Sequence, residues 1–227
     1  GEALMPHVER ILRDSRALEQ AIADHRPEER RILRIGSYTS ISRNWLPPVL
    51  KGFGAQFPDV QLTVKDGSCM DIEQWLMEGT IDVGLLSNCF SAPLEFLPLL
   101  QDPYYAVLPP EERPGETFDI SAFNGRTFFI PSKGVDTEVL RILERSGVTP
   151  RFSLIATEDS AVIKMVEQGL GCSLLSELIL RGNTDHVSLV PIDPPAFREV
   201  GAAVRSLKKV GPVLRSFLHY IRRDAEK

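Results

Sequence analysis

The pattern of hydrophobic positions changes near residue 30 of the chain. Before that point, apolar residues recur every three or four positions, which is the spacing of one face of a helix. These positions are Leu4, Val8, Ile11, Leu18 and Ile22, and the polar Ser15 occupies the step between Ile11 and Leu18. Their heptad-like spacing predicts a helix over residues 1–27 that packs either on its own domain or on a second copy of the chain. The charged residues after Pro27 predict a polar linker, which favours the second copy.

From residue 32 onward, short apolar runs alternate with longer amphipathic segments. Apolar runs at residues 32–36 and 81–86 and the alternation of apolar and polar residues at 60–64 predict strands. Between them, the sequence predicts one helix that carries Leu46 to Phe57 and another that begins at Gly67-Ser68 and ends at Gly79. The order strand, helix, strand, helix, strand predicts a parallel sheet with right-handed crossovers.

The rest of the chain repeats this alternation. Further strands are predicted at 105–108, 127–130, 152–156, 172–175, 187–190 and 200–204, with helices around 139–143, 161–167 and 213–221. Two similar α/β halves without a Ser/Gly-rich linker predict two lobes joined by crossing strands, with a cleft between them. The predicted lobe I comprises residues 31–105 plus 204–227, and the predicted lobe II comprises residues 106–203.

Small polar residues follow the predicted strands at their carboxyl ends, where open α/β sheets bind ligands. They are Ser37, Tyr38, Thr39, Ser40, Ser68, Ser87, Asn88, Ser132, Lys133, Thr157, Glu158, Asp159 and Ser160. Hydroxyls and a lysine beside the N–H groups of helix N-termini would hold a carboxylate or another small anion. Each hydroxyl could instead be only a helix N-cap. Their recurrence at successive strand ends favours a binding site.

Composition and charge exclude some classes of function. The 227 residues are 43% hydrophobic and carry a net charge of −5, which argues against a nucleic-acid-binding surface in this chain. No apolar run is long enough to cross a bilayer, and the charged start does not resemble a signal peptide. The sequence therefore predicts a soluble, cytoplasmic protein without a membrane partner.

Motifs for catalysis and metal binding are absent from the sequence. It contains no GxxxxGK[ST], GxSxG or HExxH motif, so we expect no enzyme and no cofactor. Cys69, Cys89 and Cys172 are widely spaced and odd in number, which predicts no disulfide framework, and the histidines do not cluster with them as zinc ligands. Cys172 lies in an apolar run and is predicted to be a core residue, whereas redox activity of Cys69 or Cys89 is left open.

An ordered set of motifs resembles the effector-binding domain of LysR-type transcriptional regulators. The motifs are Leu33-Arg34-Ile35-Gly36, Leu46-Pro47-Pro48-Val49-Leu50, Phe57-Pro58-Asp59-Val60, Gly67-Ser68, the segment Glu78 to Leu85 and the segment Gly169 to Leu175. The resemblance implies an α/β fold with two lobes, similar to type 2 periplasmic binding proteins. It also implies that residues 1–27 are a linker helix that mediates dimerisation, and that DNA is bound by a winged helix-turn-helix domain absent from this chain.

The resemblance also implies which residues contact the effector. Carried over by position, they are Ser37, Thr39, Ser40, Ser87, Ser132, Lys133, Glu158 and Ser160. Glu158-Asp159 places two carboxylates where many relatives have a neutral pair; facing the cleft they would favour an amine-bearing ligand, and otherwise they only stabilise a helix N-terminus. The implied partners are a carboxylate or amino-acid-like effector and further copies of the chain, in a homodimer or homotetramer that acts allosterically. The alternative is a solute-binding protein of a transport system with the same fold.

Overall fold

The computed structural model describes residue 14 and residues 31–130, 137–153, 158–182 and 186–225. Its contacts divide the chain into two compact units. Unit 1 contains the chain up to Leu100 and from Val200 onward, and unit 2 contains Gln101–Glu199. The chain passes between the units inside the strands β4 (Glu95–Leu108) and β10 (Phe197–Val204), and the predicted lobe boundaries fall in the same two strands.

The predicted dimerisation helix lies outside the described residues except for Asp14. Leu4, Val8, Ile11, Leu18 and Ile22 therefore keep the role that the sequence predicts for them.

Unit 1 is built on the predicted strand–helix–strand–helix–strand order. Strands β1 (Arg31–Ser37), β2 (Val60–Asp66) and β3 (Val83–Ser87) are joined by α2 (Thr39–Asn44), α3 (Leu46–Gln56) and α4 (Cys69–Glu78). β1 is parallel to both β2 and β3, and β10 is antiparallel to β3, which gives the strand order β2-β1-β3-β10. A short 3-10 helix (Leu207–Lys209) and the helix α8 (Pro212–Ala225) complete the unit.

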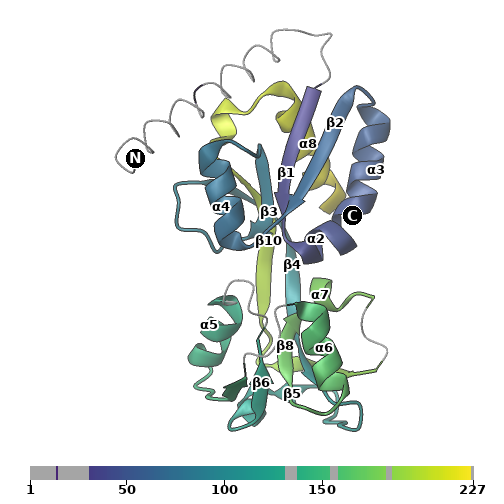
Figure 1. The fold of residues 1–227 in the computed structure, drawn as a ribbon, viewed down its shortest axis with the longest axis vertical. Coiled ribbons are helices and arrows are strands. Elements are labelled where there is room, and N and C mark those ends of the chain that lie inside the picture. The colour runs from purple at the N-terminus through teal and green to yellow at the C-terminus, as the bar shows by residue number, and fades with distance from the viewer. Residues whose placement is uncertain (1–13, 15–30, 131–136, 154–157, 183–185, 226–227) are drawn as a thin grey trace, which may run out of the picture. The chain divides into compact units, whose positions relative to one another are not determined.

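The helices cover both faces of this sheet (Figure 1). α4 packs through Ile72 and Leu76 on the face that carries Leu86. α3 and α8 pack on each other, with the rings of Phe53 and Phe217 5.2 Å apart and edge to face. Because side chains alternate along a strand, the buried Ile35 points away from the face that carries Gly36 and α4.

One predicted helix of unit 1 is two helices in the structure. The segment from Thr39 to Gln56 is divided at Trp45, and the prolines that follow occupy the first turn of α3. Proline is tolerated in the first turn, where its missing N–H would have no helical partner, but not further inside a helix. Pro47 and Pro48 therefore start α3 instead of continuing α2.

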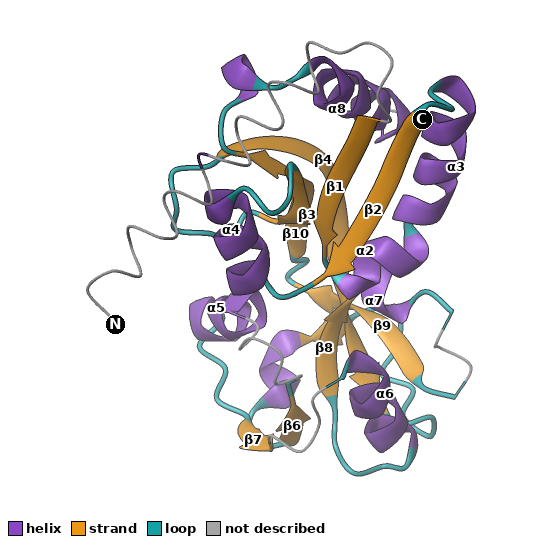
Figure 2. Ribbon diagram, turned by 45° about the horizontal axis from the view of Figure 1, so that its top comes forward, coloured by secondary structure: helices purple, strands orange, loops and turns teal. Residues whose placement is uncertain are grey.

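Unit 2 has two groups of strands (Figure 2). β4 pairs with β8 (Ser173–Ser176) and β9 (Ser188–Asp193) in antiparallel fashion, and β9 pairs with the short β5 (Phe118–Asp119). The second group is the parallel pair β6 (Thr127–Phe129) and β7 (Arg151–Ser153). The helices are a 3-10 turn (Ile120–Phe123), α5 (Thr137–Arg145), α6 (Asp159–Glu167) and α7 (Glu177–Leu180).

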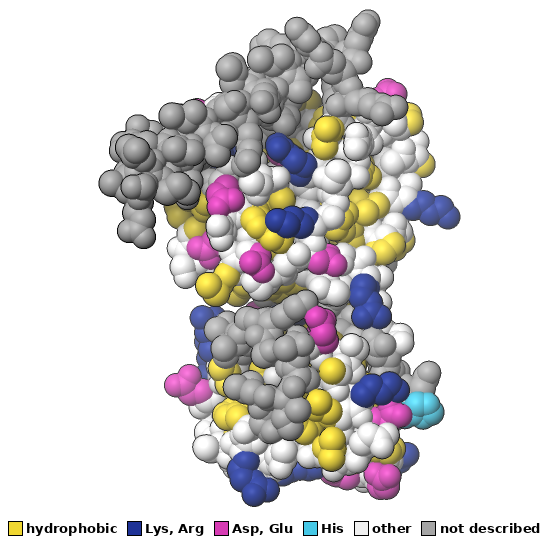
Figure 3. Space-filling model, viewed as in Figure 1, with side chains coloured by type: hydrophobic (Ala, Val, Ile, Leu, Met, Phe, Trp, Pro, Cys, Tyr) yellow, Lys and Arg dark blue, Asp and Glu magenta, His cyan; other side chains and the backbone are white. Residues whose placement is uncertain are grey.

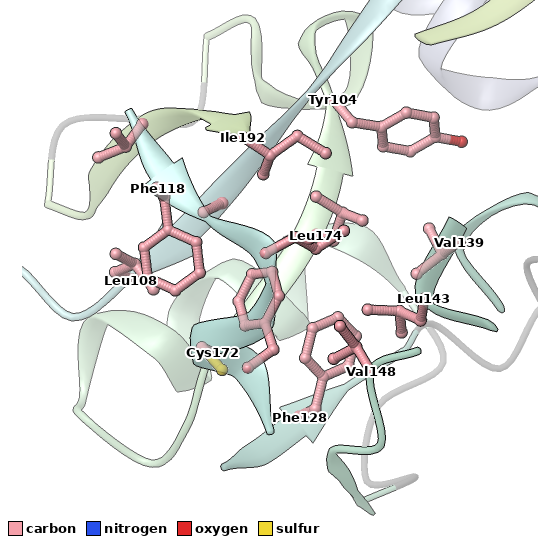
Figure 4. Packing of buried hydrophobic residues seen from close by; sticks show 14 of the residues in the cluster. Tyr104, Leu108, Phe118, Phe128, Val139, Leu143, Val148, Cys172, Leu174 and Ile192 are labelled. Atoms are coloured by element: carbon pink, nitrogen blue, oxygen red, sulfur yellow. The ribbon is translucent and has the colours of Figure 1, made fainter. Parts of the chain in front are cut away.

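An aromatic cluster forms the core of unit 2 (Figure 4). The ring of Phe123 lies 4.7 Å from that of Phe118 and 5.1 Å from that of Phe128, in the tilted and edge-to-face geometries that aromatic pairs favour. Cys172 is completely buried in the same cluster. The prediction that Cys172 is a core residue is confirmed.

Some elements of unit 2 were not predicted. The predicted strand 105–108 is only the end of β4, which begins at Glu95. Pro98, Asp102 and Pro103 interrupt the apolar pattern in the earlier part of that strand. The short elements β5 and α7 were also missed.

The described surface carries side chains of both charges. On the face drawn in Figure 3, basic, acidic and hydrophobic side chains are interspersed over the described residues. Within the described part of the chain, none of the helices combines the length and the hydropathy needed to cross a bilayer.

Candidate functional site

Ser37 and Ser87 end two neighbouring parallel strands. β1 and β3 are in register with Ser37 opposite Leu85, and the Tyr38 N–H donates to the Leu85 carbonyl oxygen at 3.1 Å. Because the strands are parallel, their carboxyl ends lie at the same edge of the sheet. Both serines are completely buried. The structure therefore brings these two predicted residues together, with Thr39 and Ser40 directly after Ser37.

Packing of α4 defines the position of this edge. A Cβ added to Gly84 would lie 2.5 Å from Ile72 Cγ2 of α4, and one added to Gly36 would lie 3.5 Å from Ile72 Cγ1 and 2.5 Å from Cδ1 of Ile81, which follows the helix. Only glycine leaves room for such a close approach between strand and helix. The Gly67 N–H also donates to the Ser37 carbonyl oxygen at 3.0 Å, so the chain leading into α4 is attached directly to the end of β1.

The hydroxyls at the end of β1 do not cap the helices that follow. The N-cap residues of α2 and α3 are Tyr38 and Trp45, and neither makes a side-chain capping hydrogen bond. The Ser37 hydroxyl donates to the Tyr38 carbonyl oxygen at 3.1 Å, Thr39 is exposed and Ser40 is buried. The alternative that these hydroxyls are only helix N-caps therefore does not hold for Ser37, Thr39 and Ser40.

Ser68 is a helix cap. Its hydroxyl accepts from the Asp71 N–H at 3.2 Å, and the Asp71 carboxylate accepts from the Ser68 N–H at 2.9 Å. This reciprocal pair is a capping box at the start of α4. For Ser68, the cap alternative considered from the sequence is therefore the correct one.

Tyr38 connects the ends of β1 and β3. Its hydroxyl oxygen lies 3.3 Å from Ser87 Oγ and 2.9 Å from Cys89 Sγ. The half-buried Tyr38 belongs to the strand-end residues of the sequence but not to the contacts implied by the resemblance. Its position between Ser37 and Thr39 was the signal that could have identified it.

Cys69 and Cys89 form a disulfide, so the prediction that the cysteines form no disulfide framework is wrong for this pair. Their Cα atoms are 6.6 Å apart, within the range that a disulfide requires. Cys69 is the first residue of α4, and Cys89 follows the end of β3. Spacing alone did not reveal the pair, but both cysteines follow strands whose carboxyl ends share one edge of the sheet. The order of the strands was therefore the signal that could have revealed the disulfide.

Only part of the predicted second group of contacts is described. Glu158 is the N-cap residue of α6 without a side-chain capping bond, and Glu158 and Ser160 are both exposed. Asp159 lies in the first turn of α6, where a carboxylate is favoured by the helix dipole. Ser132 and Lys133 lie outside the described residues.

A buried ion pair in unit 2 was missed by the sequence analysis. Arg198 Nε donates to Asp102 Oδ2 at 2.8 Å, and the Leu178 N–H donates to Asp102 Oδ1 at 2.9 Å. Burial opposes the charge of Arg198, but Asp102, Tyr104 and Glu138 together outweigh this cost and raise the pKa of the guanidinium above its ordinary value. Arg198 lies two positions before Val200 in β10, and both side chains are buried. This alternation along the strand is the sequence signal that could have identified Arg198 as a buried residue.

The described residues offer no metal centre, because no three His, Cys, Asp or Glu side chains among them gather as ligands. A cavity of about 410 Å³ lies in unit 1 at the other end of β1 from Ser37. Its lining includes Ile32, Leu33, Val204, Arg205 and Leu214, and none of the predicted effector contacts.

Sequence comparison finds a family for this chain. Residues 26–226 match the LysR substrate binding domain family. The uncharacterized HTH-type transcriptional regulator YvbU of Bacillus subtilis (strain 168) is 24% identical over 225 residues, which cover 96% of this chain and 76% of YvbU. The probable HTH-type transcriptional regulator LrrA of Synechococcus elongatus is 28% identical over 85% of this chain and 66% of LrrA.

Solved structures share the fold. The regulatory domain of CcmR from Synechocystis PCC6803, in complex with 2-PG, has a TM-score of 0.78 at 21% identity and covers 86% of this chain and 98% of that domain. The BenM effector binding domain with its effector benzoate has a TM-score of 0.77 at 20% identity, covering 88% and 94%. These domains confirm the predicted fold class. By the family match over residues 26–226, the chain belongs to the LysR family, as the effector-binding domain of a LysR-type transcriptional regulator.

Proposed function

We propose that this domain senses a small carboxylate-bearing or amino-acid-like metabolite at the carboxyl ends of β1 and β3. The observation that carries the proposal is the convergence of Ser37, Thr39, Ser40 and Ser87 at one edge of the unit 1 sheet. Hydroxyl groups donate hydrogen bonds to carboxylate oxygens, and such charge-assisted bonds are stronger than neutral ones. The BenM domain, which has the same fold, was solved with benzoate, which is a carboxylate.

The contacts predicted in unit 2 belong to the same proposal. Ser132, Lys133, Glu158 and Ser160 keep their predicted role as effector contacts. Lys133 would pair with a carboxylate, whereas Glu158 would pair with an amine. An amino acid carries both a carboxylate and an amine, so the proposal includes amino-acid-like ligands as well as simple carboxylates.

We further propose that the domain is not an enzyme and acts in the cytoplasm through allostery. Its named relatives are transcriptional regulators, which favours this reading over a solute-binding protein of a transport system. DNA contact is assigned to a separate domain, in keeping with the net charge of −5 of this chain. Two or four copies assemble, and light scattering tests this: a strict monomer at high concentration contradicts it.

A thermal-shift screen tests the sensing function. The panel contains aromatic carboxylates, dicarboxylates and amino acids, with neutral amides of the same shape as controls. A ligand present at 100 times its Kd stabilises the folded state by about 2.7 kcal/mol. For a chain of this size, that corresponds to a rise in Tm of roughly 5 to 10 °C. If no carboxylate or amino acid raises the Tm, the proposal fails.

Two variants locate the binding residues. Ser87→Ala and Thr39→Val each remove one hydroxyl, and loss of a hydrogen bond to a charged ligand weakens binding by about 10- to 100-fold. Ser173→Ala is the control for Ser87, since Ser173 is also a completely buried serine but donates to the Phe129 carbonyl oxygen in unit 2. Thr63→Val on β2 is the exposed control for Thr39. Equal binding by site and control variants contradicts the assignment.

A further inference from the structure

We propose that Cys69 and Cys89 are a reversible thiol–disulfide pair that controls the packing of the effector-site edge, and that opening the disulfide weakens effector binding. This inference rests on the proposed function for its consequence, the change in binding. The redox reaction itself requires no effector.

The disulfide lies in direct contact with the residues of the candidate site. Cys89 follows Ser87 by two positions, and its N–H donates to the Ser87 carbonyl oxygen at 2.8 Å. Cys89 Sγ lies 2.9 Å from the Tyr38 hydroxyl oxygen, which lies 3.3 Å from Ser87 Oγ. A change at this sulfur therefore reaches Ser87 both along the chain and through Tyr38.

Access distinguishes this pair from the third cysteine. Cys69 and Cys89 are both half-buried, so neither is enclosed in the core as Cys172 is. Cys172 is completely buried, and its burial raises the pKa of the thiol to about 11, which disfavours the reactive thiolate. Cys172 is thus an internal reference that does not take part in exchange.

Unit 1 does not depend on the disulfide to hold α4 in place. The Glu73 carboxylate accepts from the Ser91 N–H at 3.1 Å and from the Ala92 N–H at 3.0 Å, which attaches α4 to the segment after β3. Ile72 and Leu76 anchor α4 in a buried hydrophobic cluster. Opening the disulfide therefore releases the local contacts of Cys89 and Tyr38 while the fold persists, as a switch requires.

The proposed oxidant is a low-molecular-weight disulfide, RSSR. One protein thiolate attacks a sulfur of RSSR and releases one RS⁻, and the second cysteine then attacks the mixed disulfide and releases the other. Two protein thiols and one RSSR give the Cys69–Cys89 disulfide and two RSH. The protein loses the two electrons that RSSR gains, and its two protons appear on the released thiols. Reduction is the reverse reaction.

Titration of the 227-residue chain with reduced and oxidised glutathione tests the first step. Thiols are counted by mass after alkylation, without any effector. We expect two thiols to appear and disappear reversibly within the accessible glutathione ratios, in wild type and in Cys172→Ala but not in Cys69→Ser or Cys89→Ser. A pair that stays oxidised at every ratio while the protein is folded overturns the proposal, as does a pair whose reduction unfolds the chain.

Hydrogen exchange of the oxidised and reduced forms tests the second step. Exchange is expected to rise on reduction at residues 38–40 and 88–94 and to stay unchanged in β9. Cys89→Ser should reproduce the reduced pattern without a reductant. If exchange at residues 38–40 is the same in the oxidised and reduced forms, the disulfide is not coupled to the candidate site and the proposal is overturned.

Binding of benzoate, glutamate and succinate to both forms tests the consequence. For a panel member that binds the oxidised form, we expect binding to the reduced form to be weaker by about fivefold or more, and equal binding overturns the predicted coupling. If no panel member binds either form, the proposed function is in question, while the titration and exchange results still decide the redox pair.

Discussion

Asp102 and Arg198 are 96 residues apart in the sequence, yet their side chains form an ion pair that is almost completely buried in unit 2. Both oxygens of Asp102 are used, one by Arg198 and the other by the Leu178 N–H. The pair therefore connects β4, β10 and α7. A buried charge that loses its partner has neither water nor a counter-charge to stabilise it.

Asp102→Asn is expected to lower the free energy of unfolding by about 3 to 5 kcal/mol, because it removes the carboxylate charge that accepts from the buried Arg198 guanidinium. Urea denaturation followed by circular dichroism measures the loss. Glu177→Gln is the matched control, since Glu177 pairs with Arg181 at 2.8 Å on the surface. Exposed pairs contribute about 0 to 1 kcal/mol. Equal effects of the two substitutions would contradict the importance of the buried pair.

Gly84→Ala is expected to destabilise unit 1 by about 1 to 3 kcal/mol, the usual cost of overpacking a core. The added Cβ would lie 2.5 Å from Ile72 Cγ2 and 3.1 Å from Leu76 Cδ1, so α4 would have to move away from β3. The measurement is the midpoint of urea unfolding.

Gly54→Ala is the control for this prediction. Gly54 lies in α3, and a Cβ there meets no atom within 4 Å. Alanine is favoured over glycine inside a helix by about 1 kcal/mol, so this variant should be more stable than wild type. Opposite signs for the two glycines are the expected result, and destabilisation by both would show that the close approach of α4 is not the cause.

The parts of the fold that the sequence predicted depend on local patterns. β1 and β3 each have a short, mostly apolar run, β2 alternates apolar and polar residues, and α4 has both a capping serine and a terminal glycine, Gly79. Such signals involve residues that are close together in the sequence, so they can be recognised without knowing the fold. The first part of β4 escaped prediction because its prolines and charges hide the alternation, and the pairing partners of the strand come from distant segments.

The candidate site was predictable in position but not in its contacts. The topological rule for parallel strands placed Ser37 and Ser87 at one edge. The Cys69–Cys89 bond and the position of the Tyr38 hydroxyl depend on how α4 packs on that edge, because their partners are 20 and 51 residues away in the sequence. Asp102 and Arg198 show the same limit, since a buried charge can be predicted only together with its partner.

Ser68→Ala is expected to destabilise the chain by about 1 kcal/mol, through loss of the N-cap of α4. The ligand-induced rise in Tm should stay unchanged, because the Ser68 hydroxyl serves the capping box with Asp71. Thermal denaturation with and without ligand measures both quantities. Ser42→Ala is the control, since its hydroxyl donates to the Thr39 carbonyl oxygen within α2. Loss of ligand binding in Ser68→Ala would instead make Ser68 a contact residue.

Stability at alkaline pH should report on Cys172. Burial raises the pKa of this thiol from 9.0 to about 11, because a thiolate would lose its hydration there. Its S–H also donates to the Thr127 carbonyl oxygen at 3.4 Å, a bond that only the protonated form makes. The Cys172 thiol therefore stays protonated in the folded state at pH values at which it is already deprotonated in the unfolded state. This contribution is complete below pH 9 and is lost as the pH rises toward 11.

The expected size of this loss is about 2 to 3 kcal/mol of unfolding free energy between pH 9 and 11. Other groups titrate in the same range, so the quantity to measure is the difference between wild type and Cys172→Ala in urea unfolding at each pH. Cys172→Ala removes the titrating group, and the stability advantage of wild type should shrink as the pH rises. A difference that stays constant with pH would show that the folded state does not hold the Cys172 proton more tightly than the unfolded chain.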